Sequence, residues 1–378
     1  MNIMDRMFCK NMMRLVVVMI AVAVMAACSN GQEAQGSGNN STANEYDNVV
    51  YQPRYAKGFR IVCDSDSAIA IMISNPWQGA DSISMLYRVG KPAERIVAMS
   101  STFVAMLEEL DALDMVVGVS GLGFISSEAL CGKGNKVADV GYDTNVDYEK
   151  IVMLNPDMVL LYGINGPNMI EAKLNELAIP YIYIGDYIEE SPLGKAEWVV
   201  AIGQLIGKRN EAIGIFEGIA KRYNELKGRF ANSPNKPKVM INTPYNDSWW
   251  MPSTSNYMPQ LIADAGGDYI YKANTGNASK AIDIEQAYIL VNEADIWINP
   301  GQAFTKADVA AMAPRMTDTK VFTDGKVYNN NRRSTAGGGN DFYESGAMHP
   351  DIVLKDLVKI FYPDSLDGYL PMYYQQLP

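Results

Sequence analysis

The chain is 378 residues long, with 48% hydrophobic and 20% charged residues, enough apolar material to fill two cores of ordinary domain size. This composition excludes an intrinsically disordered chain. Beyond residue 27 the sequence holds 29 basic and 42 acidic residues, a net charge of −13. Such an acidic surface repels phosphate backbones and argues against nucleic acid as a partner.

The first 28 residues have the pattern of a targeting segment. Arg6, Lys10 and Arg14 precede an apolar run of 13 residues that ends directly before Cys28. This run is too short for a membrane-spanning helix. Basic residues, a short apolar run and small residues before a cysteine resemble a bacterial lipoprotein signal, which implies removal of residues 1–27 and a lipid on Cys28. The alternative is an ordinary secretory signal cut nearby.

Residues 28–57 are predicted to be a flexible tether behind this lipidated cysteine, since the stretch from Ser29 to Asp47 is rich in Gly, Ser and Asn. We therefore expect a periplasmic protein held at the membrane. The remaining cysteines, Cys63 and Cys131, would lie in an oxidising compartment, and whether they pair is left open. With one histidine, the chain has little from which to build a metal site of its own. Any metal is expected to arrive inside a ligand, and no resident cofactor is expected.

Residues 58–190 read as one α/β lobe with a β lead-in. The lead-in comprises strand-like runs around the turn NPWQGAD, at residues 75–81. Strands and helices then alternate from Glu94 to Asp186, which predicts a parallel sheet covered on both faces.

Residues 191–236 are predicted to form connecting helices that break near Gly207. In the second helix the apolar residues recur every three or four positions, so that it can cross a whole lobe. These residues are Ile213, Phe216, Ile219, Tyr223, Leu226 and Phe230. Alternating strands and helices resume in residues 237–378 and predict a second lobe, with residues 239–245 and 320–328 among its strands.

A repeated unit relates the two lobes. The sequence VDYEKIVMLNPDMVLLYG at residues 146–163 returns at 282–301 as IDIEQAYILVNEADIWINPG. Each copy places an Asp two residues before a Glu at the start of a predicted helix and continues into a strand. The expected fold class is therefore α/β, with two Rossmann-like lobes of parallel sheet, one long connecting helix and a ligand cleft between the lobes.

These segments, with RIVAMSSTFVAMLEELDALDMVVGVSG and the helix start SPLGKAEW, resemble the substrate-binding lipoproteins of ABC importers for iron chelates and cobalamin, the class with a helical backbone. The resemblance covers about residues 92–364. It implies a monomer that captures a ferric siderophore, haem or a corrinoid and delivers it to a dimeric permease with its ATPase. It also implies that Glu149 and Glu285 dock on the permease. The plainer alternative is that these glutamates are ordinary first-turn residues, with Asp147 and Asp283 as helix caps.

Ligands of open parallel sheets bind beyond the carboxyl ends of the strands, which nominates a set of loop residues. Paired tryptophans in the segment NDSWWMP could cover a large planar ligand, or one could be core. An arginine pair could bind ligand carboxylates, or be solvated. The candidate ligand-binding residues are Ser101, Thr102, Phe124, Tyr162, Tyr187, Tyr245, Trp249, Trp250, Gln302, Arg332 and Arg333.

The Gly-rich stretch 337–351 is predicted to be a loop that closes the lobes, with Met348 or His349 as a weaker candidate haem ligand. Cobalamin binders of the resembled family carry tryptophans at the positions of Asp143 and Ser279, so this chain departs from the corrinoid pattern. An enzyme is disfavoured, because the nucleophile elbow, the zinc-binding His pair and the phosphate loop are absent from the sequence. A surface receptor that scavenges ligand without an ABC permease is the remaining alternative.

Overall fold

The computed structural model describes residues 46, 48–132, 136–245, 248–276 and 278–378. All of them lie in one unit, residues 37–378. The predicted signal segment and Cys28 lie outside the described residues.

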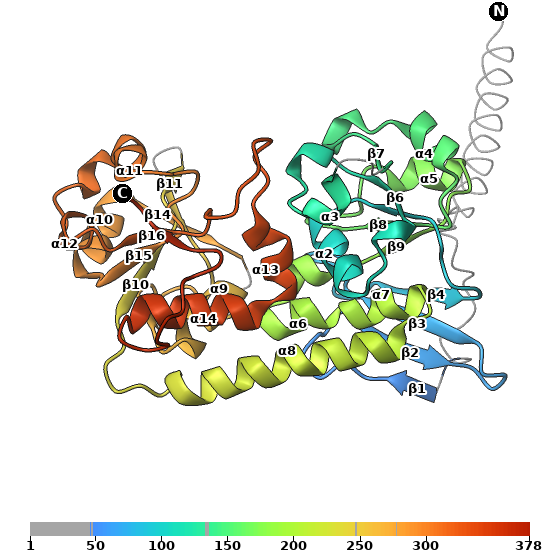
Figure 1. Cartoon of the computed structure of the whole chain (residues 1–378), viewed down its shortest axis with the longest axis horizontal. Coiled ribbons are helices and arrows are strands. Elements are labelled where there is room, and N and C mark those ends of the chain that lie inside the picture. Colours follow the sequence, from blue (N-terminus) through green and yellow to red (C-terminus); the bar gives the residue numbers. More distant parts are fainter. Residues whose placement is uncertain (1–45, 47, 133–135, 246–247, 277) are drawn as a thin grey trace, which may run out of the picture. The chain divides into compact units, whose positions relative to one another are not determined.

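The lead-in is a four-stranded antiparallel sheet (Figure 1), in the order β1-β2-β3-β4. Its strands are β1 (Asn48–Tyr51), β2 (Phe59–Cys63), β3 (Ile69–Ser74) and β4 (Ser84–Val89). The range predicted as a tether, residues 28–57, therefore includes a strand of the lead-in sheet. β1 pairs with β2, and the chain that follows it is bound by a buried carboxylate: Glu197 accepts hydrogen bonds from Tyr51 Oη and from the backbone N–H groups of residues 54–56, at 2.7 to 2.9 Å. This attachment leaves no apolar pattern in the sequence, because three of its four donors are backbone N–H groups.

The N-terminal lobe (N-lobe) has a five-stranded, fully parallel sheet in the order β7-β6-β5-β8-β9. Alternate residues of its central strands face two separate cores: Ile96 and Leu160 pack in one, Val97 and Val159 in the other. The strands are β5 (Ile96–Ala98), β6 (Val116–Val119), β7 (Ala138–Asp139), β8 (Met158–Leu161) and β9 (Tyr181–Tyr183). The helices are α2 (Ser101–Glu109), α3 (Glu128–Cys131), α4 (Tyr148–Leu154) and α5 (Glu171–Glu176).

Three helices connect the lobes: α6 (Pro192–Glu197), α7 (Val199–Leu205) and α8 (Arg209–Phe230). The predicted break near Gly207 is confirmed, since its φ of +79° ends α7 in a conformation that glycine adopts without strain. A second break, at Trp198, was not predicted. The 22 residues of α8 span about 33 Å. Its buried face, with Phe216, Ile219 and Tyr223, packs along α7 and along α14 (Pro350–Phe361) of the second lobe (Figure 1).

The C-terminal lobe (C-lobe) has a sheet in the order β13-β10-β15-β16-β17, parallel except for β17, and a smaller antiparallel sheet, β11-β12-β14. Its strands are β10 (Lys238–Ile241), β11 (Pro244–Tyr245), β12 (Ser248–Met251), β13 (Asp268–Tyr269), β14 (Lys280–Ile282), β15 (Ile296–Ile298), β16 (Val327–Asn329) and β17 (Gln375–Gln376). Its helices are α9 (Tyr257–Asp264), α10 (Ile284–Glu293), α11 (Lys306–Met312), α12 (Lys320–Thr323), α13 (Ser345–Met348) and α14 (Pro350–Phe361).

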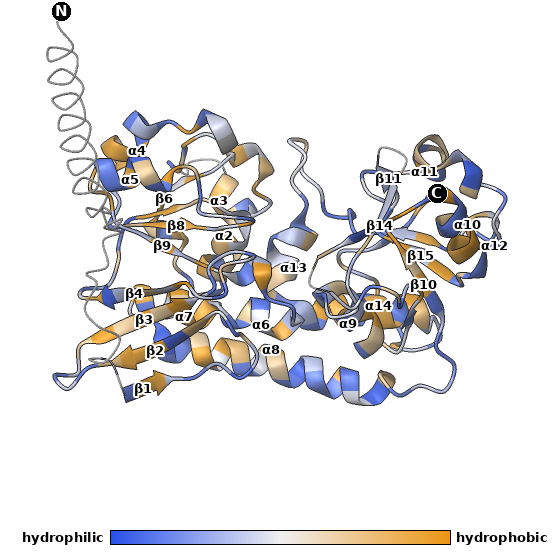
Figure 2. Cartoon of the chain, turned by 180° about the vertical axis from the view of Figure 1, so that it is seen from behind, coloured by the Kyte–Doolittle hydropathy of each residue, from blue (hydrophilic) through white to orange (hydrophobic). Residues whose placement is uncertain are grey.

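The predicted fold class is confirmed in both lobes. Hydrophilic and hydrophobic residues alternate along α8, as expected of a helix that buries one face (Figure 2). Two details differ. The predicted strand at residues 320–328 begins as a turn of helix, α12, and only its end is strand. Cys63 and Cys131 are both free thiols, so the disulfide that the sequence left open is not formed.

Candidate ligand cavity between the lobes

A cavity of about 980 Å³ is lined by residues of both lobes and of the lead-in sheet. The N-lobe contributes the loops that follow three parallel strands, with Ser101 and Thr102 after β5, Tyr162 after β8 and residues 186–190 after β9. The C-lobe contributes the start of α9 and the segment from Phe342 to Pro350. The cavity thus lies at the carboxyl ends of the N-lobe strands, where open parallel sheets bind ligands.

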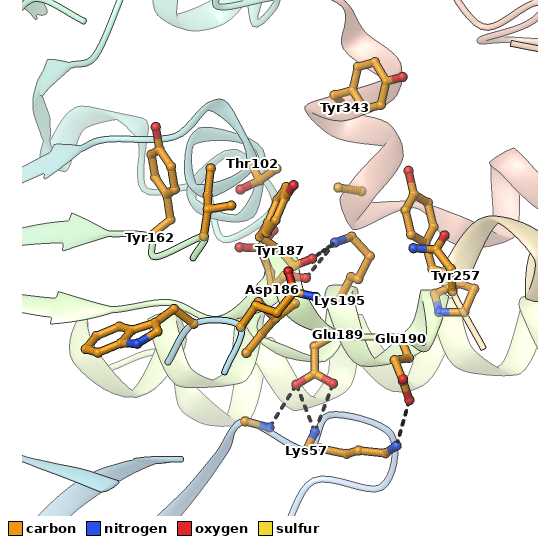
Figure 3. Close-up of a pocket in the computed structure, with 18 of the residues that line it drawn as sticks. Lys57, Thr102, Tyr162, Asp186, Tyr187, Glu189, Glu190, Lys195, Tyr257 and Tyr343 are labelled. Atoms are coloured by element: carbon orange, nitrogen blue, oxygen red, sulfur yellow. Dashed lines mark hydrogen bonds and ion pairs between the residues drawn. The ribbon is translucent and has the colours of Figure 1, made fainter. Parts of the chain in front are cut away.

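A buried lysine lies at the base of this cavity (Figure 3). Lys195 of α6 donates a hydrogen bond of 2.6 Å to the backbone carbonyl of Asp186, and its Nζ lies 5.1 Å from the ring centre of Tyr257 and 5.9 Å from that of Tyr187. Burial lowers the pKa of Lys195, while Asp186 and Glu189 act to raise it. Burial raises the pKa of the Asp186 carboxyl against the opposing effects of Lys195 and of a hydrogen bond from Thr102.

Two neighbouring glutamates join the cavity to the lead-in sheet. Glu189 accepts hydrogen bonds from the backbone N–H groups of Lys57 and Gly58 and from Trp198 Nε1, at 2.9 to 3.1 Å, although burial still raises its pKa. Glu190 pairs with Lys57 Nζ at 3.2 Å and accepts a hydrogen bond from the Ser255 hydroxyl of the C-lobe at 3.2 Å. These contacts join the lead-in and the C-lobe to the loop that follows β9.

Aromatic side chains supply much of the remaining lining. Tyr187 and Tyr343 are 58% and 54% exposed, so both rings are available for contact with a ligand. Tyr257 is half-buried, and burial raises the pKa of its hydroxyl, which stays protonated at neutral pH. Trp77 of the lead-in packs its ring against Tyr183 at 5.4 Å. A lining of aromatic faces and hydroxyls suits a large, partly apolar molecule.

Four of the predicted ligand residues line the cavity: Ser101, Thr102, Tyr162 and Tyr187. The other seven do not. Phe124 packs against Tyr142 with ring centres 5.2 Å apart, while Tyr245, Trp250, Gln302, Arg332 and Arg333 are exposed elsewhere, and Arg333 pairs with Asp341.

The prediction for Trp249 is wrong for a specific reason. Residues 248–251 form strand β12 and not a loop, so neighbouring side chains point to opposite faces. Trp249 is fully buried, donates from Nε1 to the Ile241 carbonyl at 2.8 Å and packs on Trp297, whereas Trp250 is 48% exposed.

Sequence reasoning missed Lys57, Trp77, Glu190, Lys195, Tyr257 and Tyr343. A signal for Lys195 was present in the sequence, because this lysine stands among the apolar and small residues Leu193, Gly194 and Ala196. The structure shows that the short helix they form is buried along its whole length. A lysine in that setting requires polar partners.

Residues 335–344, which overlap the predicted lobe-closing loop 337–351, contact the N-lobe. The Thr335 hydroxyl donates to the Gly123 carbonyl at 2.9 Å, and Glu344 accepts from the N–H groups of Ser126 and Ser127 at 2.7 and 2.8 Å. The weaker candidate haem ligands, Met348 and His349, lie outside the cavity lining. Met348 is buried, and His349 bonds Glu109 at 2.8 Å.

The two acidic helix starts are alike in structure. Asp147 caps α4 by accepting from Lys150 N at 2.9 Å, and Asp283 caps α10 by accepting from Gln286 N at 2.7 Å, as predicted. Glu149 and Glu285 lie in the first turns of these helices and are exposed, with Glu285 paired to Arg315 at 2.8 Å. Both acids are therefore accessible to a partner protein.

Within the described ranges, no three His, Cys, Asp or Glu side chains come together to hold a metal ion. No helix in this part of the chain is long and apolar enough to cross a membrane.

Two α/β lobes on a long helix with a cavity between them define a solute-binding architecture. Residues 96–329 match the family described as periplasmic binding protein, and the chain belongs to that family. A periplasmic heme-binding protein from Pseudomonas aeruginosa has a similar fold, with a TM-score of 0.58 at 15% identity over 76% of this chain and 98% of that chain. A periplasmic heme-binding protein from Roseiflexus has a TM-score of 0.56 at 19% identity, over 72% of this chain and 100% of that chain. An uncharacterized lipoprotein of Methanocaldococcus jannaschii is 28% identical over 74% of this chain and 68% of its own length.

Proposed function

We propose that the protein is the lipid-anchored substrate-binding protein of an ABC importer, and that it captures a metal chelate in the cavity between its lobes. The chelate is a ferric siderophore, haem or a corrinoid, and the metal is cargo carried inside it. The observation that carries this proposal is the cavity itself, since about 980 Å³ lies near the upper end of the range typical of small-molecule sites and its walls are rich in aromatic rings and hydroxyls.

The comparisons support the ligand class. Structures of similar fold include proteins described as heme-binding, from Pseudomonas aeruginosa and Vibrio cholerae. The second of these has a TM-score of 0.54 at 16% identity, and the chain covers 98% of it. Tyr162, Tyr187 and Tyr343 offer rings and phenol oxygens to such a planar molecule.

The location and partner follow from the sequence and the family. A lipid on Cys28 would tether the folded body to the membrane on the periplasmic side, and the lipoprotein relatives support that anchor. Glu149 and Glu285, each in the first turn of a matching helix, would offer one carboxylate per lobe to a dimeric permease with its ATPase.

Titration of the purified protein tests the ligand assignment. Because Trp77 lines the cavity and Trp198 bonds Glu189 beside it, tryptophan fluorescence should report occupancy. Ferric siderophores, haemin and cyanocobalamin are the probes, with free ferric ion as the control. We expect saturable binding of at least one chelate at one per chain and no response to the free ion. No response to any of the three chelates would contradict the proposal.

Replacement of Tyr187 by alanine should weaken that binding, because this residue lines the cavity and is exposed toward it. The matched control is Tyr245→Ala, an exposed tyrosine of the C-lobe outside the cavity lining, which should bind as the unmodified protein does. Equal losses in the two variants would place the ligand elsewhere.

A further inference from the structure

The lead-in sheet forms a third wall of the cavity beside the two lobes. Lys57, Ser74, Asn75, Trp77, Gln78 and Asp81 all line it. The wall is fixed to the N-lobe, since Gln78 N donates to the Ile164 carbonyl at 2.8 Å and Trp77 packs on Tyr183. The ligand environment is therefore set by the lead-in as well as by the lobes.

The charged groups around the cavity are mostly acidic. Its lining contains four carboxylates, from Asp81, Asp186, Glu189 and Glu190, and two ammonium groups, from Lys57 and Lys195. Among the described lining residues there is no arginine and no histidine. The rest of the chain adds to the negative electrostatic potential in the cavity, because it carries an excess of acidic residues.

Both ammonium groups already have protein partners. Lys57 Nζ pairs with Glu190 at 3.2 Å (Figure 3). Lys195 Nζ donates to the Asp186 carbonyl at 2.6 Å and faces the rings of Tyr187 and Tyr257. An anionic ligand would have to compete with these contacts for either cation. Because each ammonium group offsets one carboxylate, the lining keeps a formal excess of two acidic groups.

Helix N-termini at the cavity do not reverse this balance. Those of α2, α9 and α14 lie on its wall, and each is equivalent to about half a positive charge. The first turns of α2 and α9 are capped by Ser100 on Thr102 N and by Asn256 on Met258 N, and the Asp186 carboxylate faces the start of α2. The first turn of α14 has no side-chain cap but carries the acidic residue Asp351.

We propose that the cavity selects metal chelates that carry no net negative charge, and that Asp81 and Glu190 enforce this selection. The inference rests on the proposed function and narrows its ligand class to neutral or cationic chelates. Because one added ligand charge would lie within several ångströms of these carboxylates, each unit of negative charge should weaken binding by about threefold or more at low salt.

Chelates that differ only in charge test this selection. Ferrioxamine B, a monocationic ferric trihydroxamate, is compared by fluorescence titration with its neutral N-acetyl and monoanionic N-succinyl derivatives. Cyanocobalamin is compared with its monocarboxylate, and iron protoporphyrin dimethyl ester with iron protoporphyrin. Within whichever framework binds, the less negative member should bind more tightly. Tighter binding of the anion would overturn the inference and leave the proposed function standing, whereas silence from all three frameworks would contradict both.

Two variants assign the selection to residues. Glu190→Gln removes a negative charge and releases Lys57, and Asp81→Asn removes a negative charge from the lead-in wall. Each variant should bind the anionic chelate about threefold more tightly, so that the preference for the less negative chelate becomes smaller. Asp66→Asn is the matched control, an exposed lead-in carboxylate outside the cavity lining. An unchanged preference in both cavity variants, or an equal change in the control, would overturn the assignment.

Discussion

The two lobes share one surface feature and differ at the cavity. In both, a capping aspartate starts a helix whose first turn carries an exposed glutamate, Glu149 on α4 and Glu285 on α10. The cavity walls differ, because the N-lobe supplies loops after three parallel strands whereas the C-lobe supplies a helix start and the segment around α13. Shared acids suit a twofold partner, and unlike walls suit a ligand that has no such symmetry.

The exposed helix-start glutamates that the two lobes share give the first prediction. Charge reversal of Glu149 and Glu285 to lysine should reduce ligand uptake in cells by about tenfold or more, because two favourable contacts with the permease would become repulsive. Binding by the purified variant should stay within about twofold, since neither residue lines the cavity.

The matched control reverses Glu211 and Glu225, two exposed glutamates of α8. Uptake should persist in that variant. If uptake survived reversal of the two helix-start glutamates, the docking role would be wrong.

The additional antiparallel sheet of the C-lobe gives the second prediction. Trp249→Ala should lower the free energy of unfolding by about 3 to 5 kcal/mol, because it removes a fully buried ring and its hydrogen bond to Ile241. Trp250→Ala, one residue along the same strand and 48% exposed, should cost less than about 1.5 kcal/mol. Urea unfolding measures both, and equal losses would refute the assignment of Trp249 to the core.

A third prediction concerns the lead-in, which packs beside the N-lobe. Glu197→Gln replaces a buried carboxylate that accepts four hydrogen bonds by an amide with one accepting oxygen. We expect a loss of about 2 kcal/mol and faster proteolysis within residues 52–58. Glu217→Gln, on an exposed side chain of α8, serves as the control and should change neither. Unaltered proteolysis in the Glu197 variant would argue that other contacts hold the lead-in.

The fourth prediction concerns Glu344, which joins the C-lobe to the N-lobe. Burial raises the pKa of Glu344 from its usual 4.5 to about 7, against the opposing effect of the Ser126 and Ser127 N–H groups. The folded state therefore binds this proton more tightly than the unfolded state. Its contribution to stability is full below about pH 4.5 and is lost as the pH rises through about 7.

Between about pH 5 and about pH 8 the unmodified protein should lose on the order of 2 kcal/mol of stability relative to Glu344→Gln, which carries no titrating group there. Chemical unfolding at the two pH values measures this difference. A stability difference that does not change with pH would show that the carboxyl is not protonated in the fold.

Most of the lobe architecture could be predicted from the sequence, because buried parallel strands and amphipathic helices leave periodic apolar patterns. The capping aspartates Asp147 and Asp283 were predictable for the same reason, since a cap is a local interaction. The N-lobe side of the cavity could also be predicted, because ligands bind beyond the carboxyl ends of parallel strands and the N-lobe loops lie there.

The C-lobe side of the cavity could not be predicted in this way. Trp249 was assigned to a loop because β12 is short and its partner β14 lies about thirty residues further along the chain. Lys57 and Trp77 come to the cavity through the lead-in, whose position depends on backbone hydrogen bonds to Glu189 and Glu197. Contacts of that kind between distant segments leave no periodic pattern in the sequence.

Anomalous diffraction from a crystal grown with an iron or cobalt chelate would show whether the chelate occupies the cavity between the lobes. We expect one metal peak inside the cavity, with the ligand in contact with Tyr187 and with residues of the lead-in wall. A metal peak on the outer surface, or one held directly by protein carboxylates without its chelate, would contradict it.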